Sequence, residues 1–497
     1  MPSNMEPDAL APVSELQSTI RFAPSGPLPP LVVDLDGTLL KTDLLLESLF
    51  SLLRQAPLAA LAMPFWLLKG RAHLKRAIAS RVRLDVALLP YRAALLELLR
   101  VERGKGRAIV LATASDELLA QQVADHLQLF DCVLASDGDT NLSGERKRER
   151  LVSQFGERGF DYAGDGSIDL AVWSSSRKAI VVNPNPRLLR AVGKVAAIES
   201  VFDDSRPSLA EYLKALRPQQ WLKNLLVFVP VLAAHRFNES ALMLRSLLAF
   251  AAFCCCASTG YLFNDLLDLS ADRHHPRKRL RPFASGRLPL SYGLVMVPTL
   301  LVLGCVLAAF GSRLLVEVLL IYLALTLTYS FYIKTVALLD CLVLAGLYTL
   351  RIMGGAITAA IWPSAWLLAF SMFLFVSLAF VKRYDELVVM RSVDGDHAKA
   401  RAYEISDAEL LASKGTASGY VAALVLALYI SSSTAKALYR RPEYMWFLVP
   451  LLLYWVGYMW LVAHRGRMID DPLVFALRDR TSCIVIVLML GTALLAV

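Results

Sequence analysis

The sequence predicts two parts: an N-terminal α/β domain with a helical cap, followed by an all-α polytopic membrane domain of nine transmembrane helices. The first observation is composition, because 56% of the 497 residues are hydrophobic, more than a soluble globular protein usually contains. The second is distribution, because apolar runs of membrane length recur from residue 221 to the C-terminus. The third is that residues 31–200 are polar enough for a soluble domain and begin with an apolar segment typical of a β-strand.

Changes in composition set the domain boundaries. Residues 1–30 are rich in Pro and Ser and lack the charged start and apolar core of a cleavable signal peptide, so we expect a disordered tail. The α/β domain is expected at 31–200, with its cap at about 44–100. An amphipathic linker at 201–216 then leads into the membrane domain at 217–497.

The α/β domain begins with the motif LVVDLDGTLL, in which an apolar strand is followed by two acidic residues. Asp34 and Asp36 therefore stand at the carboxyl end of this strand, where open α/β sheets bind ligands. Further motif residues follow in order: Thr113, Lys147, Asp165 and Asp169. Together these motifs resemble the haloacid dehalogenase (HAD) phosphatases, which implies a Rossmann-like HAD domain.

The HAD resemblance implies a phosphoryl-transfer site, where a protein mainly positions groups and neutralises charge. Asp34 would attack phosphorus to form an aspartyl phosphate, and Asp36 would protonate the leaving oxygen and then activate water. Thr113 and Lys147 would bind the transferred phosphoryl oxygens. One Mg²⁺ is expected on the carboxylates Asp34, Asp36, Asp165 and Asp169. A noncatalytic copy of the fold is the alternative.

The cap contains an apolar stretch that is almost long enough to cross a membrane. Glu47, Arg54 and two prolines argue against a span. Three cations follow at one end: Lys69, Arg71 and Lys75. The stretch either lies on the bilayer or packs as an ordinary apolar cap. Contact with lipid would make a lipid-linked phosphate the natural substrate.

Nine apolar runs predict the membrane spans. They are 221–235, 243–263, 289–310, 313–331, 337–360, 364–381, 417–435, 443–463 and 481–497. Among the loops between these runs, those after the even-numbered runs contain most of the Lys and Arg residues. This predicts that these loops, the HAD domain and both active sites lie on the cytoplasmic side of an inner or plasma membrane. The net charge of +9 suits anionic lipid headgroups or acidic substrates, and nucleic acid is not expected. No spacing among the seven cysteines resembles a metal clip, and no disulfide is expected.

A dense cluster of charge follows the second apolar run. Asp265, Asp268 and Asp272 occur at i, i+3 and i+7, so a helical extension would place them on one face. Such hard oxygen ligands suit Mg²⁺, whose coordination is usually completed by substrate phosphates. Cations that could bind the remaining phosphate oxygens come next: Arg273, Arg277, Lys278, Arg279 and Arg281. The pattern predicts a diphosphate site, and a solvated juxtamembrane loop is the alternative.

The segment NDLLDLSAD resembles the NDxxDxxxD signature of the UbiA superfamily of intramembrane transferases. The matching residues are Asn264, Asp265, Asp268 and Asp272. The continuation DRHHPRKRLRPFASG is similar to the decaprenyl-phosphate phosphoribosyltransferases, and RPQQWLKN, KRYDEL and DDPLVFALRDR are weaker matches to that group. The resemblance implies a nine-helix UbiA fold and one Mg²⁺ on the four matching residues, with Asp268 and Asp272 catalytic. The second acidic motif of the superfamily is poorer, with only Lys334 and Asp340.

This resemblance implies transfer of 5-phosphoribosyl from phosphoribosyl diphosphate to a polyprenyl phosphate in the membrane. The cations expected to hold phosphates are Lys223, Arg273, Lys278, Arg279, Arg281, Lys334, Lys382 and Arg383. Glu386 and Asp471 either contact ribose hydroxyls or cap helices. No general base is needed, because the acceptor phosphate is already anionic.

Three readings of the whole chain remain open at this point. In the favoured one the transferase makes a polyprenyl-phosphoryl-5-phosphoribose and the HAD domain removes its 5-phosphate. In the second, UbiA-type prenyl transfer to an aromatic or lipid acceptor is joined to an unrelated phosphatase. In the third, both sites are inactive and the protein is a scaffold. Polyprenyl length and oligomeric state are not predicted.

Overall fold

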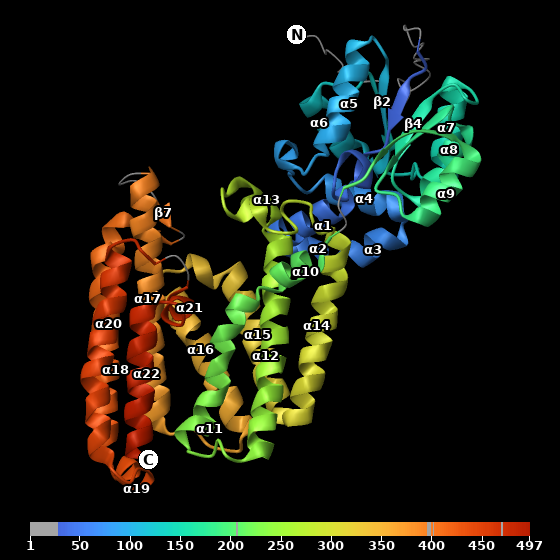
Figure 1. The fold of residues 1–497 in the computed structure, drawn as a ribbon. Coiled ribbons are helices and arrows are strands. Elements are labelled where there is room, and N and C mark those ends of the chain that lie inside the picture. The colour runs from blue at the N-terminus through green and yellow to red at the C-terminus, as the bar shows by residue number, and fades with distance from the viewer. Residues whose placement is uncertain (1–27, 205–206, 395–398, 401, 469–470) are drawn as a thin grey trace, which may run out of the picture. The chain divides into compact units, whose positions relative to one another are not determined.

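The computed structural model describes residues 28–497 except 205–206, 395–398, 401 and 469–470. Nearly all of the expected N-terminal tail therefore lies outside the described residues. The chain divides into two compact units (Figure 1). The first comprises Met1–Glu211 and Asp265–Ser291, and the second comprises Tyr212–Asn264 and Tyr292–Val497. The carboxylates and cations that follow the second apolar run thus belong to the first unit.

The first unit is built on a six-stranded sheet in the order β3-β2-β1-β4-β5-β6, with every neighbouring pair parallel. Its strands are β1 (Leu31–Val33), β2 (Ile109–Asp116), β3 (Cys132–Ser136), β4 (Asp161–Gly164), β5 (Lys178–Val182) and β6 (Ala197–Phe202). The strand order reverses at β1, which makes its carboxyl end the switch point where such sheets bind ligands. The predicted α/β fold is confirmed.

Helices cover both faces of this sheet. They are α5 (Ala93–Gly104), α6 (Glu117–Leu127), α7 (Glu145–Phe155), α8 (Leu170–Ser175) and α9 (Pro186–Val195). Leu31 and Val33 of β1 pack into the core beneath α5 and α6, whereas Val32 packs into the core beneath α7, α8 and α9. All three side chains are fully buried, as expected for a central parallel strand without polar alternation.

Four α-helices lie between β1 and α5, within the segment expected to form the cap. They are α1 (Leu44–Gln55), α2 (Pro57–Ala60), α3 (Met63–Leu68) and α4 (Arg71–Ala79). Asp43 caps α1, because its carboxylate accepts a hydrogen bond from the amide of Leu46 at 3.0 Å. Pro57 then starts α2 at a position where a missing amide proton costs nothing.

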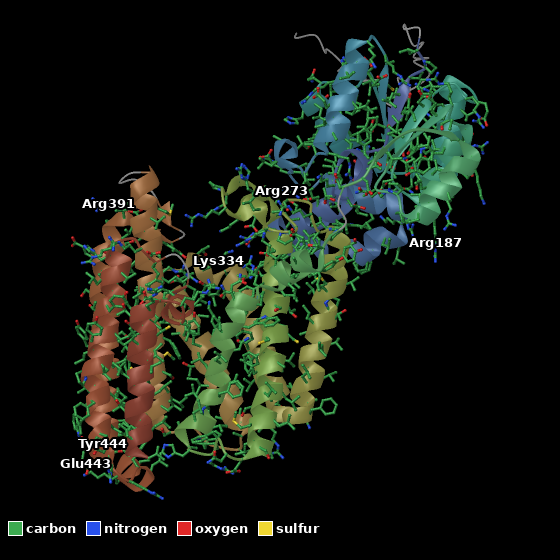
Figure 2. All side chains as sticks on the ribbon, viewed as in Figure 1. Arg187, Arg273, Lys334, Arg391, Glu443 and Tyr444 are labelled. Carbon is green, nitrogen blue, oxygen red and sulfur yellow. The ribbon has the colours of Figure 1, made fainter. Side chains whose placement is uncertain are left out.

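The second unit is helical apart from one short antiparallel pair, β7 (Lys399–Ala400) and β8 (Tyr403–Glu404). Among the described residues, seven helices are long and apolar enough to cross a membrane: Ser240–Leu267, Leu290–Gly311, Arg313–Phe331, Leu339–Thr358, Ala365–Arg391, Ile405–Ser431 and Pro442–His464. They correspond to α12 (Ser240–Leu267), α14 (Leu290–Gly311), α15 (Arg313–Phe331), α16 (Leu339–Thr358), α17 (Ala365–Asp394), α18 (Ala408–Ser431) and α20 (Leu448–His464). Figure 2 shows Lys334 and Arg391 at one end of this unit and Glu443 and Tyr444 at the other.

The first and last of the nine predicted spans differ from these seven. The first is a 3₁₀ helix, Pro218–Phe228, followed by the short α11 (Val229–Ala233). Pro230 at the start of α11 has no amide proton and interrupts a continuous hydrogen-bond ladder. The last is α22 (Arg480–Ala496), which has 17 residues. The expected number of nine transmembrane helices is therefore not confirmed.

Candidate active sites

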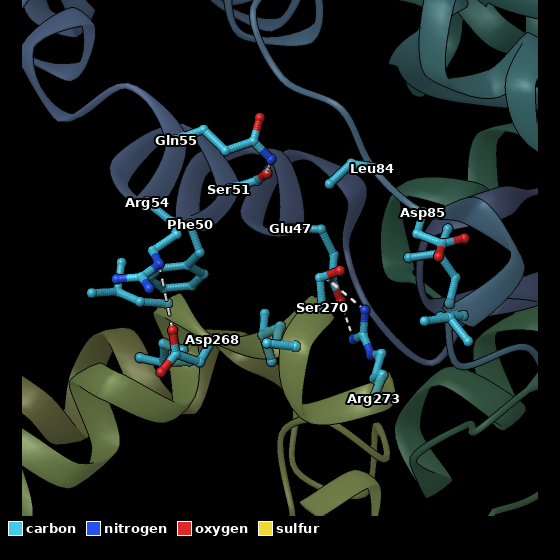
Figure 3. Close-up of a pocket in the computed structure, with 16 residues that line it drawn as sticks. Glu47, Phe50, Ser51, Arg54, Gln55, Leu84, Asp85, Asp268, Ser270 and Arg273 are labelled. Atoms are coloured by element: carbon cyan, nitrogen blue, oxygen red, sulfur yellow. Dashed lines mark hydrogen bonds and ion pairs between the residues drawn. The ribbon is translucent and has the colours of Figure 1, made fainter. Parts of the chain in front are cut away.

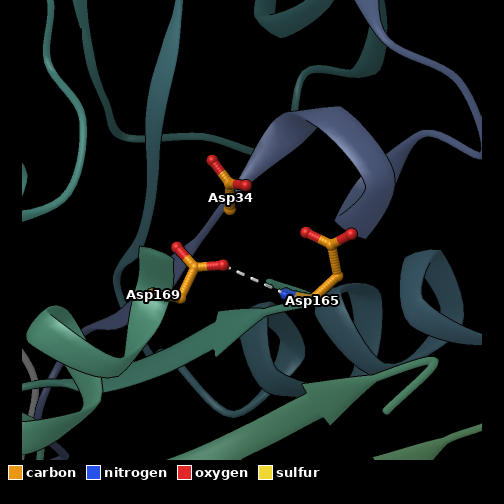
Figure 4. A group of neighbouring side chains, drawn as sticks. All are labelled: Asp34, Asp165 and Asp169. Carbon is orange, nitrogen blue, oxygen red and sulfur yellow. Dashed lines mark hydrogen bonds between the residues drawn. The ribbon is translucent and has the colours of Figure 1, made fainter. Parts of the chain in front are cut away.

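Three carboxylates meet at the carboxyl edge of the sheet in the first unit (Figure 4). Asp34 follows β1, Asp165 follows β4, and Asp169 lies one turn later in a 3₁₀ helix. One oxygen from each lies within 4.8 Å of the other two. Asp36, the fourth predicted ligand, is outside this group. A cluster of carboxylate oxygens of this kind is a suitable site for Mg²⁺.

Lys147 neutralises part of this acidic cluster. Its buried ammonium group donates hydrogen bonds to Asp34 Oδ1 at 2.7 Å and to the hydroxyl of Tyr162 at 3.1 Å. The Tyr162 hydroxyl in turn donates to Asp169 Oδ1 at 2.7 Å. Burial opposes the charge on Lys147, but the nearby charges of Asp34 and Asp169 raise its pKa above the ordinary value. Tyr162 was not predicted from the sequence, because an apolar strand residue carries no signal of this role.

Asp36 is held separately by hydrogen bonds to its two carboxylate oxygens. The amide of Leu44, the first residue of α1, donates to Oδ1 at 2.7 Å, and the hydroxyl of Ser115 donates to Oδ2 at 2.5 Å. Burial, followed by the charge of Asp43, raises the pKa of Asp36 to about 7. This value suits a group that has to give and then take a proton near neutral pH.

The remaining predicted group, Thr113, is buried in the same domain, and the turn after Asp36 is conformationally restricted. Thr113 is fully buried near the end of β2, and its hydroxyl oxygen accepts a hydrogen bond from the amide of Ser115 at 3.0 Å. Gly37 has φ +74°, and a Cβ atom there would lie 2.2 Å from Asp165 Oδ2. The turn after Asp36 therefore requires glycine for both its conformation and the close approach of Asp165.

The acidic motif after the second apolar run is not one continuous helix, contrary to the expectation of a helical extension. The chain leaves α12 after Leu267, and Asp268 precedes the short α13 (Leu269–His274) with non-helical angles. Asp265 and Asp272 nevertheless converge on Arg281, whose guanidinium lies 3.1 Å from Asp265 Oδ1 and 2.5 Å from Asp272 Oδ2. Asn264, the other predicted ligand, lies in α12.

The cap helix α1 contacts this acidic motif within the first unit (Figure 3). The guanidinium of Arg273 donates two hydrogen bonds to the carboxylate of Glu47, at 2.5 and 3.1 Å, and both side chains are buried. Arg54 lies 3.5 Å from Asp268. These groups border a cavity of about 270 Å³ between α1 and the acidic motif. Arg273, predicted to bind phosphate, is thus engaged by a residue 226 positions away that no local pattern could pair with it.

In the second unit, the predicted residues gather in two buried clusters. The carboxylate of Asp471 lies 2.8 Å from the ammonium of Lys223 and 2.9 Å from that of Lys382, and it accepts a hydrogen bond from Tyr348 at 3.1 Å. Burial alone would raise the pKa of Asp471, but the two ammonium groups hold it well below its ordinary range. Asp470, in the same predicted segment, lies outside the described residues.

The second buried cluster surrounds Arg383. Its guanidinium donates to Asp340 at 2.5 Å, to Glu386 at 2.7 Å and to the hydroxyl of Tyr329 at 2.5 Å. Asp340 also accepts a hydrogen bond from Tyr403 at 2.6 Å. The lone acid of the weak second motif is therefore held by protein donors on both of its oxygens.

Three predicted cations lie outside these clusters. Lys278 and Arg279 are exposed in a 3₁₀ turn of the first unit, and Lys334 is half-buried in the turn Ile333–Thr335 of the second. A fourth cation was missed. Arg351 is buried in α16 and donates to Asn224 and Tyr322, each at 2.8 Å. A charged residue inside an apolar run was the available signal.

The matching family model is the UbiA prenyltransferase family, over residues 225–477. The chain belongs to this family. It is 37% identical over 459 residues to the uncharacterized protein y4nM of Sinorhizobium fredii, covering 91% of this chain and 88% of that one. Nodulation protein NoeC of Azorhizobium caulinodans is 39% identical over 286 residues, 57% of this chain and 91% of its own. Decaprenyl-phosphate phosphoribosyltransferase of Mycolicibacterium smegmatis is 30% identical over 288 residues, 56% and 90% of the two chains.

Solved structures also match each part of the chain. A UbiA homolog from Archaeoglobus fulgidus bound to DMAPP and Mg²⁺ covers 57% of this chain and 98% of its own, at 16% identity and a TM-score of 0.45. A phosphoserine phosphatase in apo form covers 38% and 98%, at 15% identity and a TM-score of 0.26. The predicted resemblance to UbiA transferases of the decaprenyl-phosphate phosphoribosyltransferase type is confirmed by the family and its relatives. With its seven apolar helices, this UbiA family member is an integral membrane protein.

Proposed function

We propose that this protein is a bifunctional membrane enzyme. Its UbiA domain transfers 5-phosphoribosyl from phosphoribosyl diphosphate to a polyprenyl phosphate and releases pyrophosphate, and its HAD-like domain hydrolyses the 5-phosphate of that product. The observation that carries the proposal is the segment DRHHPRKRLRPFASG, which follows the acidic motif directly. Phosphoribosyl transfer brings together a diphosphate, a 5-phosphate and an acceptor phosphate, and these need more cations than prenyl transfer to an apolar acceptor does.

The acidic motif is suited to a divalent cation. Asp265, Asp268 and Asp272 offer carboxylate oxygens, and Asn264 offers an amide oxygen, all of which are ligands that Mg²⁺ accepts. When bound there, the ion would neutralise charge on the departing pyrophosphate. Arg281, which now neutralises two of these carboxylates, becomes a donor for phosphate oxygens once a cation takes its place.

The remaining groups orient the sugar and the acceptor. In the first unit, the exposed cations Lys278 and Arg279 are suited to bind phosphate oxygens. In the second, Asp471, held ionised between Lys223 and Lys382, is suited to accept hydrogen bonds from ribose hydroxyls. The bond from ribose C1 to the diphosphate oxygen breaks as the acceptor phosphate oxygen bonds to C1 from the opposite face. The acceptor is anionic at neutral pH, so no base has to remove a proton.

The phosphatase reaction has two steps at the edge of the sheet. In the first, an oxygen of Asp34 attacks phosphorus, the bond to the ribose oxygen breaks, and Asp36 gives that oxygen its proton. In the second, Asp36 takes a proton from water, which attacks the aspartyl phosphate and releases inorganic phosphate. Lys147 neutralises the phosphoryl oxygens throughout. Mg²⁺ on Asp34, Asp165 and Asp169 would add to this neutralisation.

We place both reactions on the cytoplasmic side of an inner or plasma membrane, because the Lys-rich and Arg-rich loops follow alternate apolar runs. We keep nine transmembrane helices as part of the proposal, counting Pro218–Ala233 and α22 as the first and the last. Prenyl transfer, the activity that gives the family its name, is the second candidate. The weak second acidic motif weighs against it, since Asp340 is the lone carboxylate there and offers few ligands for a second ion.

The choice of donor tests the transferase. Purified full-length protein is supplied with polyprenyl phosphate, Mg²⁺ and either ribose-labelled phosphoribosyl diphosphate or a labelled prenyl diphosphate with an aromatic acceptor. We expect label in the lipid fraction from the ribosyl donor, and none from it with the Asp268→Ala variant. Label transferred from the prenyl donor alone would replace this proposal by prenyl transfer.

A further inference from the structure

The cap of the HAD-like domain exposes a cluster of large apolar side chains on α2, α3 and the turn between them. Leu58 is 82% exposed, Leu61 72%, Phe65 69% and Leu68 85%. Apolar groups gathered in this way on one short stretch usually mark a surface that contacts a partner or a membrane. A membrane is the available partner for this surface, because the same chain contains helices long and apolar enough to cross a bilayer.

Directly after this apolar cluster, the structure has a cationic cavity of about 380 Å³. It is bordered from the cap by Lys69, Arg71 and His73, and from the α/β core by Asn141, Arg146 and one acid, Asp139. In the part of the chain that the structure describes, no ion pair engages the side chains of Lys69, Arg71 or Arg146. Three cations against one acid leave an excess of positive charge around the cavity, which favours an anionic ligand.

The cationic cavity adjoins the phosphatase site. Lys75, in the helix that begins at Arg71, donates hydrogen bonds to Asn141 Oδ1 at 2.8 Å and to the carbonyl oxygen of Ala114 at 2.5 Å. Ala114 follows Thr113, the predicted phosphoryl-binding residue. Arg146 likewise precedes Lys147, which binds Asp34. Lys75 thus bonds both a lining residue of the cavity, Asn141, and the backbone beside Thr113.

We propose that the cap docks on the bilayer surface and selects a lipid-anchored substrate. The apolar side chains of α2 and α3 enter the headgroup region, and the cationic cavity binds the phosphodiester that joins the lipid to its sugar. The terminal phosphate monoester then lies at Asp34. The substrate class is thus a phosphate monoester that carries a second, lipid-linked phosphate. The inference rests on the proposed hydrolysis, and it adds the site that distinguishes this substrate from a free sugar phosphate.

Substrate selection tests the cavity. Full-length protein in anionic nanodiscs is assayed for hydrolysis of polyprenyl-phosphoryl-5-phosphoribose and of ribose 5-phosphate. We expect the double variant Arg71→Gln/Arg146→Gln to lower the ratio of kcat/KM, lipid over free sugar, by about tenfold or more, the scale of one lost charge-assisted contact. The control Arg150→Gln, in the same helix as Arg146 but outside the cavity, keeps the parent ratio. An unchanged ratio in the double variant overturns the cavity assignment.

A crosslinking measurement tests the docking without any activity. Photoreactive benzoylphenylalanine is placed at Leu68, or at Val101 as the control, in full-length protein in the same nanodiscs. Val101 is 47% exposed near the end of α5, which leads toward the amino ends of the strands, away from the cap. We expect lipid adducts from position 68 alone. Lipid adducts without hydrolysis of the lipid ester would support the docking and overturn the proposed function. Hydrolysis without adducts would support the proposed function and overturn the docking.

Discussion

At the scale of residues, burial and a few hydrogen bonds give similar carboxylates different roles. Asp34 lies against Lys147, while Asp36 accepts hydrogen bonds from Ser115 and from the first amide of α1. Burial is the largest influence on both, and it raises the pKa of Asp34 to about 6 and that of Asp36 to about 7. The ion pair makes Asp34 the better nucleophile, and the higher pKa makes Asp36 the better acid.

The Ser115→Ala variant tests the role of Asp36. The Ser115 hydroxyl stabilises the ionised carboxylate, so its removal raises the pKa of Asp36 above about 7. Asp36 then stays protonated to higher pH, and the alkaline limb of the kcat profile for a phosphate monoester moves upward. The profile of the parent protein is the reference. A limb that stayed in place or moved downward would show that another group supplies the proton.

At the scale of elements, α1 serves two sites at once. Its first amide fixes Asp36, and three residues later Glu47 forms the buried ion pair with Arg273. Removing one partner of such a pair leaves a buried charge without its counter-ion, which is strongly destabilising. An exposed ion pair contributes little by comparison.

The Glu47→Gln variant should therefore unfold far more readily than a surface variant. We expect a loss of about 3 kcal/mol or more in stability, and partial recovery when Glu47→Arg is combined with Arg273→Glu. Thermal unfolding in detergent measures both. The matched control is Arg100→Ala, since Arg100 and Glu97 form an exposed pair at 3.6 Å that should contribute at most about 1 kcal/mol. Equal stability of Glu47→Gln and this control would contradict the importance of the pair.

Some contacts between secondary-structure elements could be predicted from the sequence, and others could not. Asp34 could be placed at the sheet edge because it follows an apolar strand. Asp165 and Lys147, the latter on α7, were expected beside it only from the resemblance to HAD phosphatases. The break at Asp268 did not follow, because spacing at i, i+3 and i+7 favours an unbroken helix. The partner of Arg273 could not be predicted either, since a contact across 226 residues depends on tertiary packing rather than on any local pattern.

At the scale of the whole molecule, the two sites are distinct sets of residues in one chain. Asp268 of the acidic motif and Arg54 of α1 form an ion pair and are 29% and 36% exposed. The loss of this pair should therefore lower the stability of the protein only slightly. We expect Asp268→Ala to abolish ribosyl transfer and to leave hydrolysis of ribose 5-phosphate within about twofold of the parent, consistent with a change under about 0.5 kcal/mol. Parallel assays on one preparation check this. Loss of both activities would mean that the acidic motif also supports the phosphatase fold.

The most direct measurement of the central claim compares the parent protein with Asp34→Asn. Each is incubated with polyprenyl phosphate, Mg²⁺ and phosphoribosyl diphosphate, and the lipid products are weighed by mass spectrometry. We expect a ribosyl lipid without the 5-phosphate from the parent and the phosphoribosyl lipid from Asp34→Asn. The same phosphorylated lipid from both proteins would contradict the coupling of the two reactions.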